Sequence, residues 1–564
     1  MLTVHPLGIV FGMLMYVVSV SPSLLPRRWW WHGVVSGSMV AAGYSVGWLT
    51  TNVGALVLET LEVQITYDPD LAIWVPVLFW LLFSIWFLRA VWMSYRASED
   101  VALRVNMKPV GPGEYLLGVV TGVGIFIVVM ALVVLLSRAD SAVVHWLSRW
   151  TGEPIAWLVV SGAIFYLVLL FSNRVVFRVI MAFFARESAR RNDRTASGIT
   201  RPQVPERSGS PGSLVTWKSV GAQGRAFLSR GPSRADIEEL TGRPALEPIR
   251  AYVGLRGKDF DAQAQLLVKE MRRAGAFKRK AILVNVATGS GWVDEWTAQP
   301  FEYMMEGDCA VVSMQYSYLF SAAIFVSDKD VCRDAARALF KAVKSEVNSL
   351  ENPPLLFLGG ESLGAEAAQY PFADAEDMAA SVDGALLVGS PCESPVLSQI
   401  TEGRHRGSPE VAPVYESGRQ FRVVNDPQQL DVDIYGRKFG PWEYPRIAFA
   451  QHASDPVVWY TTELAFREPD WIVEKAGLDV SPKLVYTQIV TFLQIIGDLP
   501  MAGTAPGGHG HTYWGELIPI WERLLGAGDE GVPARYPQDV PHLDREELSR
   551  RIRTNIEDSG RGDR

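Results

Sequence analysis

Five stretches without a charged residue occupy most of the first third of the chain, at 6–26, 33–58, 71–88, 115–137 and 155–172. A helix of about 20 apolar residues crosses a bilayer. Single segments cross as helices because every backbone polar group must be satisfied within the segment. The sequence therefore predicts an α-helical transmembrane N-terminal domain of about five spans over residues 1–185. The second stretch is rich in Gly, Ser and Thr, so it could also be kinked or re-entrant.

Basic residues between these stretches predict the orientation. Arg27 and Arg28 follow the first stretch, four basic residues follow the third, and six arginines lie at 174–194, whereas the connection after the second is acidic. Positive loops stay on the cytoplasmic side. We therefore expect a multi-pass protein of the plasma membrane with its N-terminus outside and the rest of the chain cytoplasmic. The orientation reverses if the second stretch does not span.

Charge and cysteine content exclude several classes of function. The formal net charge of −8 argues against a nucleic-acid partner, which requires a basic face. The stretches hold no Asp, Glu, Lys or Arg, so an ion path is disfavoured. Cys309, Cys332 and Cys392 lack metal-ligand spacing and cannot form a disulfide framework. We expect no metal and no cofactor.

Beyond the apolar stretches, residues 186–213 are rich in Arg, Ser, Pro and Gly. They predict a basic linker, either near anionic lipid head groups or simply solvated. From 214 to 534 short apolar runs alternate with helical patterns, which is typical of a mostly parallel sheet with crossover helices. Residues 395–445 predict an insertion suited to a cap or lid, and the charged tail 535–564 predicts disorder. The strands are expected at 249–253, 281–286, 310–315, 355–358, 384–388 and 446–450.

A short motif follows the strand expected at 355–358. Gly360-Glu361-Ser362-Leu363-Gly364 has the G-x-S-x-G pattern and precedes a helical segment. In a nucleophile elbow, this strand–turn–helix context lifts a serine hydroxyl above the sheet edge, and Gly360 and Gly364 leave room for the tight turn. The sequence predicts that Ser362 is a nucleophile.

A serine nucleophile needs a base and an acid that orients the base, and after an elbow the acid precedes the histidine in the chain. The glycine-rich segment at 506–514 offers His511, which we favour because packed structure follows it, and His509 as a rival. Asp455 follows the strand at 446–450 and would project from the ligand-binding edge of the sheet. Glu393 is the alternative acid, and His452 is expected to be structural.

The oxyanion of an acyl-transfer intermediate needs backbone N–H donors. The residue after the nucleophile, Leu363, should supply one, and the turn after the strand 281–286 should supply another from Thr288 or Gly289. Aromatic residues near 292–296 and 316–320 predict either ordinary core or an acyl pocket at the same edge.

These residues resemble the α/β-hydrolase superfamily, and the whole arrangement is similar to the membrane-anchored α/β-hydrolase family of actinobacteria. The most specific matches are 289–294 (GSGWVD), 315–319 (QYSYL), the elbow, and 508–513 (GHGHTY). The resemblance implies a Ser–His–Asp hydrolase. Similarity to enterococcal and actinobacterial aminoacyl-phospholipid hydrolases suggests a lipid-ester substrate at the inner leaflet, with membrane lipids as partners. An acyltransferase with the same triad and a non-catalytic membrane scaffold remain alternatives.

Overall fold

The computed structural model describes residues 5–63, 69–152 and 177–558, with isolated positions between 153 and 176. The chain forms two compact units. A helical unit contains Met1–Arg178 together with Thr462–Pro506. A sheet unit contains Val179–Thr461 and Gly507–Arg564. Residues 462–506 therefore leave the sheet unit and belong to the helical one, which the sequence did not predict.

The sheet unit is built on seven parallel strands in the order β1-β3-β2-β4-β5-β7-β6. Every strand from β1 to β5 has its residues buried on both faces, apart from the last residue of β4, as expected for a parallel sheet covered by helices. The strands are β1 (Ile249–Val253), β2 (Ala281–Val286), β3 (Cys309–Met314), β4 (Leu355–Glu361), β5 (Gly384–Val388), β6 (Phe421–Val424) and β7 (Arg446–Ala450).

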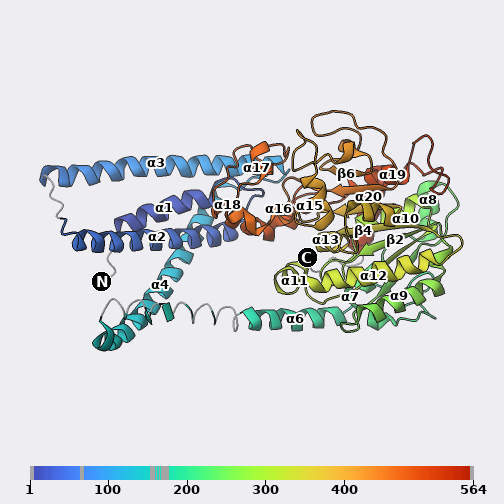
Figure 1. Cartoon of the computed structure of the whole chain (residues 1–564), viewed down its shortest axis with the longest axis horizontal. Helices are drawn as coiled ribbons and strands as arrows, with labels where there is room; N and C mark the ends of the chain where they lie inside the picture. The colour runs from blue at the N-terminus through green and yellow to red at the C-terminus, as the bar shows by residue number, and fades with distance from the viewer. Residues whose placement is uncertain are drawn as a thin grey trace. The chain divides into compact units, whose positions relative to one another are not determined.

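Helices cover both faces of this sheet (Figure 1). On one face lie α9 (Phe260–Ala274) and α12 (Asp330–Asn348), which pack against each other. On the other lie α10 (Glu295–Met304), α19 (Leu517–Leu525) and α20 (Arg545–Asp558). The remaining helices of this unit are α7 (Gly221–Ser229), α8 (Arg234–Thr241), α11 (Ser321–Ser327), α13 (Leu363–Ala367), α14 (Ala375–Ser381), α15 (Pro395–Glu402) and α16 (Pro456–Trp459).

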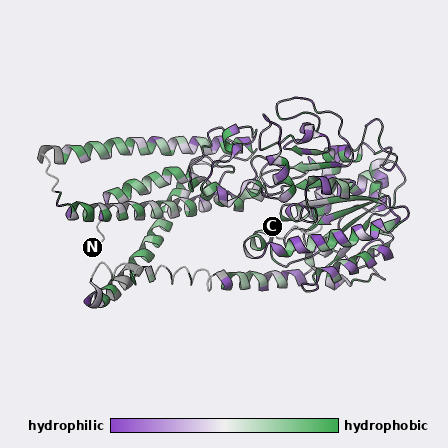
Figure 2. Ribbon diagram, in the orientation of Figure 1, coloured by the Kyte–Doolittle hydropathy of each residue, from purple (hydrophilic) through white to green (hydrophobic). Residues whose placement is uncertain are grey.

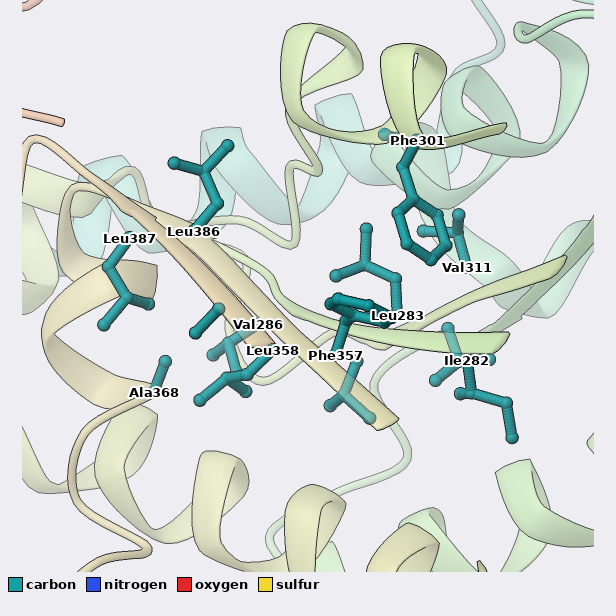
Figure 3. Close-up of a cluster of buried hydrophobic side chains, with 14 of the residues drawn as sticks. Ile282, Leu283, Val286, Phe301, Val311, Phe357, Leu358, Ala368, Leu386 and Leu387 are labelled. Atoms are coloured by element: carbon teal, nitrogen blue, oxygen red, sulfur yellow. The ribbon is translucent and has the colours of Figure 1, made fainter. Parts of the chain in front are cut away.

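The hydrophobic core fills the space between the central strands and these helices (Figure 3). Phe301 of α10 meets Phe357 of β4 edge to face, with 5.3 Å between ring centroids. Both side chains are fully buried. Burial of a large apolar side chain contributes about 1.5–3 kcal/mol. This packing makes β4 a rigid base for the turn that follows it.

The six expected strands are confirmed, β3 with a shift of one residue. The expectation that 395–445 is only an insertion between sheet strands is wrong, because it contains β6, the edge strand beside β7. The sequence does not reveal this strand because its apolar run, Phe421–Val424, is only four residues long and lies within a long polar stretch rich in turn residues. Arg422 is buried, and its guanidinium donates to the carbonyls of Gly418 (2.9 Å) and Gly440 (2.8 Å).

The expected linker at 186–213 is also structured differently. Its first part continues α6 (Phe177–Asp193), and its second part is held on the sheet unit by Glu270. Glu270 accepts hydrogen bonds from the hydroxyls of Ser208 (3.1 Å) and Ser213 (2.6 Å) and from the N–H of Leu214 (2.8 Å). Burial raises the pKa of Glu270, but bonds from Arg273, Ser213 and Leu214 outweigh it and leave that pKa below its usual value.

The predicted disorder of the tail is wrong for residues 545–558, which form α20. Leu548 and Ile552 of this helix are fully buried in the core of the sheet unit. Arg551 bonds to Glu239, near the end of α8, at 3.2 Å. The three apolar residues of this helix, Leu548, Ile552 and Ile556, recur every four residues, but they are isolated among charged and polar residues of the kind that predict disorder.

The helical unit contains α1 (Pro6–Ser19), α2 (Trp29–Thr60), α3 (Pro69–Arg104) and α4 (Pro112–Thr151). The Gly-rich second stretch is a continuous helix, α2, which packs against both α1 and α4. A Cβ at Gly47 would lie 2.4 Å from the carbonyl oxygen of Leu7, and one at Gly37 would lie 2.4 Å from that of Gly122. The small residues of α2 are therefore needed for close helix packing.

The number of spans differs from the expected five. Among the described residues two helices are long and apolar enough to cross a membrane, Ile73–Arg104 and Pro112–Leu135. Figure 2 shows their hydrophobic character. The helix α1 is apolar but has only 14 residues, and α2 has 32 but is less apolar because of its small residues. Most of the fifth stretch, 155–172, lies outside the described residues.

Residues 462–506 join the helical unit through a buried carboxylate. They include α17 (Asp470–Glu474) and α18 (Val490–Asp498). Asp498 is fully buried and accepts hydrogen bonds from the hydroxyl of Ser23, from the N–H of Leu24 (3.0 Å) and from Nε of Arg27 (2.9 Å). The turn between α1 and α2 and the end of α18 are thus one packed structure.

Candidate active site

The turn after β4 has the geometry of a nucleophile elbow. Ser362 joins β4 to α13 with φ 57° and ψ −126°, a conformation that non-glycine residues rarely adopt. A Cβ at Gly360 would lie 2.7 Å from the backbone of Gly364, and one at Gly364 would lie 2.4 Å from the carbonyl oxygen of Val286. Both motif glycines are therefore required by close approach of the backbone.

The structure brings the favoured acid and base together. Nδ1 of His511 lies 2.6 Å from Oδ2 of Asp455, and the Asp455 side chain is fully buried. Its other oxygen, Oδ1, accepts the N–H of Val457 at 2.8 Å, so Asp455 also begins α16 as a helix cap. Nε2 of His511 is buried and makes no hydrogen bond within the described residues. This nitrogen is thus available for a proton from outside the pair.

Two further side chains hold the acid and the base loop in place. The hydroxyl of Tyr513 donates to Oδ2 of Asp455 (2.9 Å) and accepts the N–H of His452 (3.0 Å). Burial raises the pKa of Tyr513 far above its usual value, so the phenol stays protonated and acts as a donor. The ring of His452 stacks on Tyr513 with centroids 4.1 Å apart, and its Nδ1 lies 2.8 Å from the carbonyl oxygen of Gly510.

The base lies beside the elbow, because both contact the end of β5. The N–H of Ser362 donates to the carbonyl of Val388 at 2.8 Å. The next residue, Gly389, is packed so closely on the base that a Cβ there would lie 2.7 Å from Cε1 of His511. The end of β5 therefore contacts the backbone of Ser362 through Val388 and the imidazole of His511 through Gly389.

The candidate oxyanion donors differ in whether their N–H groups already have an acceptor. As the first residue of α13, Leu363 has an N–H without an intrahelical acceptor, which suits an oxyanion donor. The N–H of Thr288 already donates to the carbonyl of Trp292 at 2.9 Å. The N–H of Gly289, the other candidate after β2, faces the buried hydroxyl of Tyr316 instead. The turn is fixed from the other side by a 3.1 Å contact between the hydroxyls of Thr288 and Ser321.

The remaining candidates lie elsewhere. His509 pairs with Thr512 across the turn that carries His511 and is not the residue bonded to Asp455. The exposed Glu393 bonds to the hydroxyl of Thr461. Trp296 is core, stacked on Trp514 with centroids 6.0 Å apart, while Phe320 is 47 % exposed. Among the residues that the structure describes, no group of His, Cys, Asp and Glu could hold a metal ion.

Sequence reasoning missed the contacts that Tyr513 and Gly389 make with His511 in addition to its bond with Asp455. From the sequence, Tyr513 indicates only the start of packed structure after the base, although a Tyr two residues past a histidine can reach the same acid. Gly389 follows β5 with φ 56°, and nothing in the sequence around it points to a histidine more than a hundred residues later. Both contacts depend on the tertiary fold.

The parallel sheet, the elbow after its central strand and the Asp–His pair at the same edge define the architecture of an α/β-hydrolase. Comparison with protein families agrees. Residues 249–533 match the alpha/beta-hydrolase family, and residues 20–232 match the N-terminal region of an alpha/beta-hydrolase family. The chain belongs to this family, and its N-terminal helices are part of the match. No curated protein and no solved structure matches the chain.

Proposed function

We propose that the protein is a membrane-bound serine hydrolase of the esterase or lipase type, acting on a lipid ester at the inner leaflet of the plasma membrane. The observation that carries the proposal is the 2.6 Å contact between His511 and Asp455 beside a strained serine elbow. The family membership supports a hydrolase, and the chemistry follows from the residues.

In the proposed reaction, Oγ of Ser362 attacks the acyl carbon of the ester while Nε2 of His511 accepts the hydroxyl proton. Asp455 holds the imidazole by Nδ1 and stabilises its positive charge. The N–H group of Leu363 stabilises the oxyanion. His511 then protonates the leaving alcohol, an acyl-enzyme remains on Ser362, and a water molecule activated by His511 releases the acid.

The lipid substrate is inferred from the helical unit. Two of its helices are long and apolar enough to cross a membrane, and most of the large apolar side chains on α3 are exposed to the surroundings. Helices with this surface belong in lipid. A membrane anchor raises the local concentration of a membrane-resident ester, which is the advantage that a hydrolase gains from such a unit. An aminoacyl-phospholipid is one ester of this class.

The proposal is tested with full-length protein in lipid nanodiscs. Wild-type protein should hydrolyse a short soluble acyl ester and bind a fluorophosphonate probe covalently, and Ser362→Ala should do neither. The matched control is Ser398→Ala, on α15, which should keep both properties. Probe labelling of the Ser362→Ala protein equal to wild type would refute the role of Ser362. Absence of probe labelling in wild-type protein would indicate a non-catalytic membrane scaffold. Transfer of the acyl group to an added alcohol in preference to water would indicate an acyltransferase with the same triad.

A further inference from the structure

Residues 462–489 of the helical unit form an unusually apolar surface. Large apolar side chains that are more than half exposed follow one another along this short stretch, namely Phe466 (76 %), Val473 (59 %), Leu478 (74 %), Val485 (67 %) and Ile489 (55 %). In the described part of the whole sheet unit after α6, only Leu214 and Tyr435 are large apolar side chains that are more than half exposed. Exposed apolar side chains concentrated in this way indicate an interaction surface.

This stretch is bonded to the end of a candidate membrane span. The hydroxyl of Ser481 donates to Asp100 at 2.7 Å, and Nη1 of Arg104 donates to the carbonyl of Leu478 at 3.5 Å. Both Asp100 and Arg104 belong to the last turns of α3 (Figure 1). They lie just past Trp92 and Arg96, whose guanidinium covers the Trp92 ring at 5.1 Å. A Trp–Arg pair of this kind is typical of the membrane interface.

The distance along α3 indicates the depth of residues 462–489 relative to the bilayer. From Arg96 to Asp100 is one helical turn, about 6 Å at 1.5 Å per residue. The polar layer on each side of the hydrocarbon core is about 5–8 Å thick. Residues 462–489 are therefore attached at the level of the lipid head groups, provided that α3 crosses the membrane.

The exposed side chains at the two ends of the stretch are brought together by the backbone. The N–H of Ile489 donates to the carbonyl of Ala465 at 3.0 Å, and the side chain of Gln488 donates to the carbonyl of Phe466 at 3.4 Å. Ile489 has φ 62°, which is unfavourable for a β-branched residue. The bonds hold this conformation and keep Phe466 and Ile489 on neighbouring backbone segments.

We propose that residues 462–489 insert Phe466, Leu478 and their exposed apolar neighbours into the interfacial layer of the bilayer, on the side where α3 ends. The stretch carries five acidic and three basic residues, so attraction to anionic lipids does not drive the contact. Burial of apolar side chains does, and the contact should therefore be insensitive to salt.

The inserted stretch has a specific place in the chain. It leaves the sheet unit shortly after Asp455, and the chain returns shortly before His511. The acid and the base of the proposed site are therefore joined through a segment that is in contact with lipid. This part of the inference rests on the proposed function, whereas membrane insertion itself does not depend on catalysis.

Insertion is tested by fluorescence on full-length protein in vesicles. A nitrobenzoxadiazole dye is attached to Phe466→Cys, to Leu478→Cys and, as a control in the same stretch, to Glu468→Cys. Burial raises the pKa of Cys332 and of Cys392 to about 12 and that of Cys309 well above its usual value, so the native thiols stay protonated during labelling. Lipids carrying a shallow acyl-chain nitroxide should quench the dye at 466 and at 478. Iodide should not quench the dye at these two positions at either low or high salt, whereas it should quench the dye at 468.

Equal iodide quenching at all three positions would overturn the proposal. Protection from iodide without quenching by the nitroxide lipid would also overturn it, because a protein partner or a second copy would then cover the surface.

A kinetic test separates this inference from the proposed function. Phe466→Ser combined with Leu478→Ser should lower hydrolysis of a long-chain lipid ester in vesicles at least tenfold, while hydrolysis of a soluble short-chain ester stays within twofold of wild type. An equal loss on both substrates, or no loss on either, contradicts the surface role. If wild-type protein cleaves neither ester, the proposed function fails, while the fluorescence result still decides whether the stretch inserts.

Discussion

Replacement of Gly389 by alanine tests the geometry of the proposed site without touching a catalytic group. The new Cβ would lie 2.7 Å from Cε1 of His511 and 2.9 Å from Cε2 of Tyr513. Carbon atoms in contact are about 3.5–4.0 Å apart, so the imidazole must move by about 1 Å. A displacement of about 1 Å in a catalytic group costs roughly 100-fold in rate, or about 2.7 kcal/mol of activation free energy.

The backbone at Gly389 adds a smaller cost. Its φ of 56° lies in the left-handed region, where an alanine loses about 1–2 kcal/mol of stability. Gly242, at the end of α8, has φ 66°, but a Cβ there would meet no atom of the described residues within 4 Å. Gly242→Ala therefore carries the strain without the collision. Gly389→Ala should lose more stability than Gly242→Ala because the collision adds to the strain, and only Gly389→Ala should lose activity.

The assay is kcat/KM on a soluble acyl ester together with the thermal midpoint of each variant. We expect Gly389→Ala to fall about 100-fold in kcat/KM and Gly242→Ala to remain near wild type, with both melting a few degrees lower. The reasoning is refuted if Gly389→Ala keeps wild-type kcat/KM, or if Gly242→Ala loses as much.

Three further predictions follow from the contacts. His511→Gln should lower kcat at least 1,000-fold and His509→Gln less than tenfold, because only His511 bonds to the acid; the reverse order in steady-state kinetics would reassign the base. Glu302→Gln should lower the free energy of unfolding by about 3 kcal/mol, since it leaves the fully buried Arg250 with one carboxylate fewer; chemical denaturation with an unchanged midpoint would contradict this. The pKa of Glu270 is lowered on folding, so its stabilisation is complete above the usual Glu value of about 4.3 and is lost as the pH falls through the folded pKa. The melting-temperature difference between wild type and Glu270→Gln should therefore shrink as the pH drops from 6 to below 4, and a difference that grows on acidification would rule out this role.

The strands and the elbow were readable from the sequence because they are local patterns. Runs of buried β-branched and aliphatic residues define β1 to β5 and β7, and the two motif glycines define the turn at Ser362. Where an apolar run is only four residues long, or where charged residues surround isolated apolar ones, local reasoning fails. Phe421–Val424 of β6 is such a short run in a long polar stretch, and the charged face of α20 concealed Leu548 and Ile552.

The number of membrane spans shows a second limit of reasoning from local sequence patterns. Absence of charge was enough to mark a stretch as apolar, yet the glycines of α2, such as Gly37 and Gly47, serve contacts with neighbouring helices. Absence of charge and hydrophobicity are different properties. A stretch of small residues lacks charge because close helix packing requires small side chains. Such a stretch is uncharged without being strongly hydrophobic.

By itself the sequence determined the class of fold, the position of the serine elbow, and a short set of candidates for nucleophile, acid and base, because each is specified by residues close together in the chain. The tertiary structure decided the rest. It selected His511 over His509 through the bond to Asp455, added Tyr513 and Gly389 as its supports, and assigned residues 462–506 to the helical unit. These are contacts between segments that are distant in sequence, and their partners are chosen by how the strands and helices pack.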